Sequence, residues 1–300
     1  MRFRSHGRVL GAPFGWNRGF SVAARPWNVA RQMLEAEKAE EAHLLLSVEI
    51  QKELKSFQTS RSWAMPLLLL ELSKSFLKLS EPQDALTALE HSVALFEDNF
   101  ANTLTEEGDE HARYVEALLH LAKLLFVSGQ GNPEHLWKKA ISHALKHEGR
   151  ESYHVLVATV GLSEFSLEQL RLEDADRYTA AATELARQLQ PTRPVRERLV
   201  EAVVMQGLAR LQRQDAEGGM RFFLQAMTEI EEIEVAAGGL DMWTRSAYHN
   251  LYRNIDHVYK TAQDEDKRRG KRDGWVLPLF HLIFPLFRME GKARRQAGPL

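Results

Sequence analysis

Cysteine is absent from the 300-residue sequence. Its absence excludes thiol nucleophiles, cysteine-ligated zinc, iron–sulfur clusters and the disulfide framework of a small secreted protein. The sequence also lacks an uninterrupted apolar stretch of the roughly 20 residues that a membrane-spanning helix requires. With 44% hydrophobic and 27% charged residues, the composition is that of a globular protein large enough to bury a core without disulfides or metals.

Acidic residues are missing from the first 34 positions, and the first of them is Glu35. The same stretch holds six arginines, at positions 2, 4, 8, 18, 25 and 31. Residues 35–240 contain 21 basic and 34 acidic side chains, whereas residues 241–300 contain twelve basic and seven acidic ones. The net charge of −2 is therefore the sum of a basic leader, an acidic body and a basic tail.

The leader has the composition of a mitochondrial presequence, which is rich in arginine, free of acids and interspersed with apolar residues. Its segment Arg18-Gly19-Phe20-Ser21 resembles the cleavage sites of such presequences. We expect cleavage after Phe20, which removes residues 1–20 and leaves a mature protein in the mitochondrial matrix. A disordered basic tail without a targeting role is the alternative interpretation.

Apolar residues recur at intervals of three and four from about residue 28 to residue 262, and the alternating pattern of strands is rare. Glycine, proline and short polar clusters divide this region into segments of 15–25 residues. The sequence therefore predicts an all-α protein of about ten helices. They are expected at residues 28–56, 62–79, 82–98, 109–128, 133–148, 152–170, 173–189, 194–213, 216–236 and 241–262.

Small residues recur at matching places in successive pairs of predicted helices. The first helices carry Ser73, Ala122, Ser163 and Gly207, and the second helices carry Ser92, Ala140, Ala182 and Ala226. Within each pair the two small residues are 18 or 19 positions apart. Antiparallel helices need small side chains where their backbones approach closely. The spacing therefore indicates four repeated helical hairpins.

These hairpins resemble the tetratricopeptide repeat, a 34-residue pair of helices with small residues at its eighth and twenty-seventh positions. The run from Ser73 to Ser92 follows the family pattern best. The long linkers between repeats, and the way residues 108–111 lead into a helix, are similar to the repeats of kinesin light chains. The resemblance implies a right-handed superhelical stack of antiparallel helix hairpins.

A stack of this kind buries its core only through neighbouring repeats, so its ends need caps. The predicted organisation therefore has five parts. They are a presequence at 1–20, a linker and N-terminal capping helix at 21–61, the helical repeats at 62–236, a C-terminal capping helix at 237–263 and a basic, aromatic-rich tail at 264–300.

The resemblance also implies a partner-binding groove lined by the first helix of each repeat. The family's groove positions correspond here to thirteen residues: Leu67, Leu70, Lys74, Leu77, Leu119, Lys123, Phe126, Val157, Val160, Leu167, Val204, Leu208 and Leu211. Because most of them are apolar, we expect an exposed groove that holds an apolar helix or segment of another protein subunit. A terminal helix of this chain filling the groove is the alternative.

The tail combines basic residues with a short apolar segment that contains two prolines. Its expected anchor residues are Trp275, Leu277, Phe280, Phe284 and Phe287. Aromatic and arginine side chains are typical of the centres of protein interfaces. The same composition suits shallow docking on an anionic inner membrane. The tail is therefore expected to contact a partner subunit, with the membrane surface as the second interpretation.

Residues with catalytic or metal-binding chemistry form no convincing set in the sequence. His143 and His147 are four residues apart on one predicted helix, but spacing places no third ligand near them. We therefore expect no metal, no cofactor and no catalytic site. The acidic body disfavours direct binding of nucleic acid, since phosphate neutralisation dominates that affinity.

These features favour a non-catalytic interaction scaffold, as a subunit or assembly factor of a mitochondrial complex. The respiratory chain or ATP synthase, on the matrix side of the inner membrane, is the expected setting. A helical-repeat protein that is associated with mitochondrial ribosomes or RNA processing is the main alternative. An enzyme of unfamiliar helical fold is the third hypothesis.

Overall fold

The structure, a computed structural model, describes residues 25–56, 62–101, 109–213 and 215–236. These residues form ten α-helices and no strand. The prediction of an all-α protein is therefore confirmed. The helices are α1 (Pro26–Glu35), α2 (Ala39–Ser56), α3 (Ala64–Lys78), α4 (Pro82–Ala101), α5 (Glu110–Ser128), α6 (Glu134–His147), α7 (Tyr153–Glu168), α8 (Leu172–Gln188), α9 (Arg193–Gln212) and α10 (Ala216–Ala236).

Three predicted features lie outside the described residues. They are the presequence with its cleavage residues Arg18, Phe20 and Ser21, the helix at 241–262, and the tail with Trp275, Leu277, Phe280, Phe284 and Phe287. Among the helices that are described, none combines the length and the apolar character needed to cross a bilayer.

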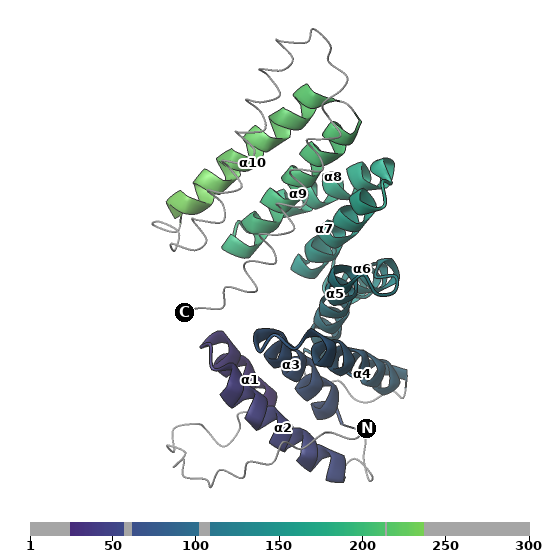
Figure 1. Cartoon of the computed structure of the whole chain (residues 1–300), viewed down its shortest axis with the longest axis vertical. Coiled ribbons are helices and arrows are strands. Elements are labelled where there is room, and N and C mark those ends of the chain that lie inside the picture. The colour runs from purple at the N-terminus through teal and green to yellow at the C-terminus, as the bar shows by residue number, and fades with distance from the viewer. Residues whose placement is uncertain (1–24, 57–61, 102–108, 214, 237–300) are drawn as a thin grey trace.

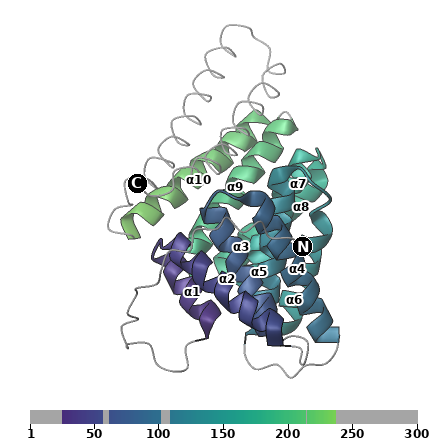
Figure 2. The same ribbon diagram turned by 60° about the horizontal axis from the view of Figure 1, so that its bottom comes forward.

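Consecutive helices pair into hairpins that follow one another in chain order along a curved stack (Figure 1). The pairs are α1 with α2, α3 with α4, α5 with α6, α7 with α8 and α9 with α10. First helices of successive hairpins also contact one another, as α5 does with α7 and α7 with α9. In Figures 1 and 2 alike, α4 and α6 lie on one side of the stack and α3 and α5 on the other.

The first predicted helix, at residues 28–56, is divided into α1 and α2 in the structure. Glu37 adopts a left-handed conformation, with a φ of 64°. The N–H of Lys38 then donates to the carbonyl of Met33 at 2.8 Å, which satisfies a carbonyl that the end of α1 would otherwise leave free. No glycine or proline marks this break, so the sequence pattern predicted one continuous helix over residues 28–56.

The small residues that define the repeats are buried where helices approach each other. None of the seven serines and alanines of this set exposes any surface, and Gly207 is buried with them. A Cβ atom at Gly207 would lie 2.6 Å from the ring of Phe223, and one at Gly161 would lie 2.5 Å from the ring of Trp137. The hydroxyl of Ser92 donates to a carbonyl of α3 at 2.7 Å. Close helix approach therefore depends on the small residues that the spacing predicted, and also on Gly161, which the spacing did not include.

The hydrophobic core extends along the whole stack and is not concentrated at one place. Three clusters of buried residues follow one another, the first around α1 to α3, the second around α3 to α8 and the third around α7 to α10. Phe96, Trp137 and Phe223 are among their largest fully buried side chains. This arrangement is what a repeat protein produces, because each hairpin buries its apolar face only against its neighbours.

Candidate functional site on the first-helix face

The predicted groove residues lie on the first-helix face, which we define as the side of the stack built by α3, α5, α7 and α9. Nine of the eleven apolar ones are at most 7% exposed. These nine are Leu67, Leu70, Leu119, Phe126, Val160, Leu167, Val204, Leu208 and Leu211. Leu77, Val157, Lys74 and Lys123 are half-buried.

The expectation of an exposed apolar groove is therefore wrong at the nine buried positions. First helices contact each other as well as their own second helices. As a result, Leu70 and Phe126 belong to one core cluster, and Val160 and Leu208 belong to another. The apolar residues hold the stack together, and the role of the face in binding a partner stays a prediction.

The first-helix face carries instead a row of charged and polar side chains that pair between helices. Nζ of Lys74 on α3 lies 2.6 Å from Oε1 of Glu116 on α5. Nε2 of His120 lies 3.7 Å from the same oxygen. One helical turn further along α5, Lys123 pairs with Glu164 of α7. The side chains of His120 and Lys123 are both 40% exposed, so this row is open to solvent.

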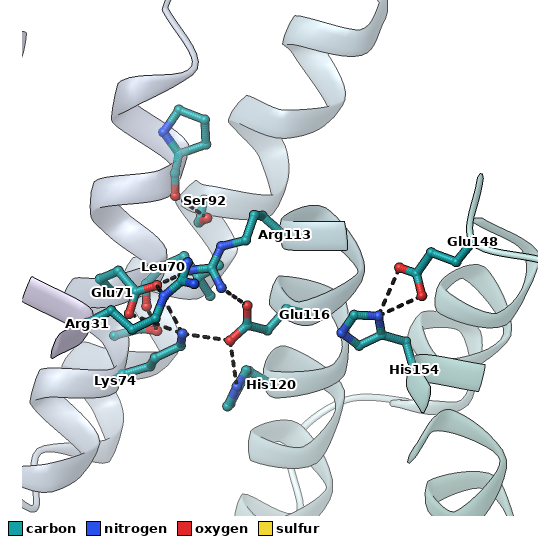
Figure 3. A network of polar contacts seen from close by, with 12 residues as sticks. Arg31, Leu70, Glu71, Lys74, Ser92, Arg113, Glu116, His120, Glu148 and His154 are labelled. Atoms are coloured by element: carbon teal, nitrogen blue, oxygen red, sulfur yellow. Dashed lines mark hydrogen bonds and ion pairs between the residues drawn. The ribbon is translucent and has the colours of Figure 1, made fainter. Parts of the chain in front are cut away.

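The row ends in a buried cluster at the junction of α1, α3 and α5 (Figure 3). At its centre, Glu71 is fully buried. Its Oε1 lies 3.0 Å from Nζ of Lys74 and 3.4 Å from Nε of Arg31. It also pairs with Arg113, which is 5% exposed and pairs in turn with Glu116. Three cations and two carboxylates therefore connect α1, α3 and α5 at one end of the first-helix face.

Burial and pairing set the charges of this cluster. Burial alone would raise the pKa of the Glu116 carboxyl, but the neighbouring His120 and the positive charges of Lys74 and Arg113 outweigh it and hold that pKa well below its usual range. Burial lowers the pKa of Lys74, and the negative charge of Glu116 opposes this effect. Burial also lowers the pKa of Arg113 to about 10. At neutral pH, Glu116 and Arg113 are therefore both ionised.

An open depression of about 540 Å³ adjoins the buried cluster, because Arg31 belongs to both. It is polar, and it lies between α1 and the start of α5. Its lining residues are Arg25, Trp27, Asn28, Arg31, Gln32, Glu35 and Asp109.

Sequence reasoning did not single out the residues at the centre of this site. The available signal was Glu71, the one acid in an otherwise leucine-only run over residues 67–72. A charge at such a place must be paired or exposed, but its partner Arg113 is 42 positions away. Reasoning from spacing also missed His111, which lies beside His143 and His147. In both cases only the hairpin packing brings the partners together.

Comparisons with known proteins add a likeness to solved structures. No family model and no curated protein sequence matches the chain. A solved structure of the Rap conjugation gene regulator of the plasmid pLS20, in complex with the Phr* peptide, is similar over 91% of this chain and 76% of that one. The sequence identity is 11% and the TM-score is 0.49. At these values the likeness supports no inference about function.

Proposed function

We propose that this protein is a non-catalytic interaction scaffold that binds a partner protein along its first-helix face. The observation that carries the proposal is the row of partly exposed ionisable side chains across α3, α5 and α7. This is the face to which the tetratricopeptide resemblance assigns partners. A stack of hairpins presents such a face as a long, continuous surface, which suits recognition of an extended segment.

The partner segment is proposed to be polar and to carry charges of both signs. Nine of the predicted apolar contacts are used inside the stack, so they offer a partner little apolar surface. The exposed row presents cationic Lys123 beside anionic Glu164, with His120 beside Glu116. Charged pairs of this kind contribute to specificity and association rate more than to affinity.

The mitochondrial matrix is the proposed compartment. Its support is the arginine-rich, acid-free stretch of 34 residues at the start of the sequence. Within the matrix we propose a role as a subunit or assembly factor of a respiratory-chain or ATP-synthase complex, with the basic tail touching a partner subunit or the anionic inner membrane. Determining the N-terminal residue of the protein purified from mitochondria tests the proposed localisation. An intact Met1 would rule out cleavage after Phe20.

Affinity capture of the full chain from mitochondria, followed by mass spectrometry, tests the binding face. We expect the combined substitution His120→Ala and Lys123→Ala to reduce recovery of the principal partner about tenfold, equivalent to about 1.4 kcal/mol of binding free energy. Both side chains are partly exposed, so the fold should survive, which circular dichroism can verify.

Lys139→Ala is the matched control. Lys139 is 46% exposed and also pairs between helices, with Glu97 at 2.9 Å, but it lies on α6 outside the first-helix face. Equal loss of the partner in both variants, or in neither, would refute binding along the first-helix face. Recovery of mainly ribosomal proteins, in a complex that RNase disperses, would favour the alternative of a ribosome-associated protein.

A further inference from the structure

Three histidines from two helices meet at one end of the α5/α6 hairpin. His143 and His147 are one turn apart on α6, and His111 lies in the first turn of α5. One ring nitrogen of each lies within 4.8 Å of those of the other two. Nδ1 of His111 is 2.7 Å from Nε2 of His143. Hairpin packing therefore supplies the third histidine that the spacing of the other two could not.

Aromatic side chains hold the inner rings of this histidine cluster in place. Phe100 of α4 stacks on His111, with ring centres 4.6 Å apart and planes within 1° of parallel. Tyr114 of α5 meets the ring of His143 edge-on at 4.9 Å. His147, in contrast, is exposed to solvent. The cluster thus has a packed inner side and an open outer side.

The histidine cluster also has the chemistry of a metal-binding set. Neutral imidazole is the form of histidine that binds metal ions. Three imidazole ligands that leave one position open match the coordination of Zn²⁺ with a bound water.

We propose that His111, His143 and His147 together bind one Zn²⁺ ion, with a water molecule at the fourth position on the open side. Tetrahedral zinc with bonds of about 2.0–2.1 Å places its ligand nitrogens about 3.3 Å apart. The present separations, from 2.7 Å up to 4.8 Å, lie on both sides of that value. Zn²⁺ binding therefore requires the rings to turn until the three nitrogens converge, including the ring of His147, which now stacks on His111 with ring centres 3.5 Å apart. The bound ion joins the first turn of α5 to the last turn of α6, independently of any partner on the first-helix face.

Isothermal titration of the full chain with ZnCl₂, using protein without a polyhistidine tag, tests this site. We expect one Zn²⁺ per wild-type chain and an affinity at least tenfold lower in His147→Gln and in His111→Gln. Because His147 is exposed, its substitution leaves the core intact, and circular dichroism verifies the fold of each variant. His91→Gln changes an exposed histidine of α4 and should bind Zn²⁺ like the wild type.

Two results of the Zn²⁺ titration would overturn the proposal. One is the absence of stoichiometric Zn²⁺ binding to the wild-type chain. The other is binding that neither His147→Gln nor His111→Gln weakens, or that His91→Gln weakens equally. Replacement by Co²⁺ gives an independent readout, since tetrahedral Co²⁺ absorbs visible light strongly. That absorption should be present in the wild type and lost in His147→Gln, and an octahedral spectrum in the wild type would contradict the proposed four-coordinate geometry.

Discussion

Replacement of Glu71 by glutamine should destabilise the protein strongly although the side chain keeps its size. In the structure Glu71 is fully buried and neutralises charge from Arg31, Lys74 and Arg113. After the substitution, Lys74 and Arg113 keep their ion pairs with Glu116, whereas Arg31 loses its pair with Glu71. The variant therefore gains an uncompensated positive charge inside the junction of three helices.

The expected loss in unfolding free energy is about 3 kcal/mol, because removing one partner of a buried ion pair costs roughly 3–5 kcal/mol. We take the lower end of that range since Arg31 is 32% exposed and can turn toward water. For a folded region of this size, about 2–4 °C of melting temperature accompanies each kcal/mol. The melting temperature should therefore fall by about 6–12 °C.

Urea and thermal unfolding of the full chain, followed by circular dichroism, measure this effect. Glu217→Gln is the control, because Glu217 pairs with Arg221 on one exposed helix surface and both side chains are more than three-quarters exposed. Such a pair contributes less than about 0.5 kcal/mol. A loss below about 1 kcal/mol in Glu71→Gln, or one equal to that of the control, would refute the role assigned to the buried cluster.

Two further perturbations test helix approach and charge. Gly161→Ala should lower the melting temperature, because the new Cβ would lie 2.5 Å from the ring of Trp137. Overpacking costs about 1–3 kcal/mol, whereas the higher helix propensity of alanine gains at most about 1 kcal/mol. A clear rise in the melting temperature would contradict this prediction. The pKa of Glu116 in the folded protein lies below its ordinary value of 4.5, since pairing outweighs burial. Its stabilisation is thus present above about pH 4.5 and is lost as the pH falls below it. Urea midpoints measured through this range should depend less on pH in Glu116→Gln than in the wild type, and identical profiles would argue against this linkage.

The local sequence pattern was sufficient to predict most of the helices and their pairing into hairpins. Helix periodicity, together with the glycines, prolines and polar clusters between segments, predicted the helices from α3 to α10 at close to their observed positions. This held even for α7 and α9, which bury residues around most of their circumference and have no single apolar stripe. The spacing of Ser73, Ser92 and their counterparts predicted the hairpins, since close backbone approach excludes larger side chains. The division of residues 28–56 was missed because Glu37, not a glycine, takes the left-handed turn.

The site was less accessible to sequence reasoning because its residues act through partners on other helices. Family positions assigned Leu67 and Leu208 to first helices of repeats, which are α3 and α9 in the structure, but they did not reveal that both side chains are buried. Lys74 and Lys123 were identified as single positions, whereas their carboxylate partners are supplied by the next hairpin along the stack.

The sequence by itself determined that this protein is a helical repeat protein with a basic leader, an acidic body and a basic tail, because composition and periodicity are properties of adjacent residues. Only the tertiary structure decided which ionisable side chains of different helices contact each other. Glu71 and Arg113 are 42 positions apart, and His111 and His143 are 32 positions apart. Contacts of this kind depend on the angle and offset between hairpins, which many distant side chains set together.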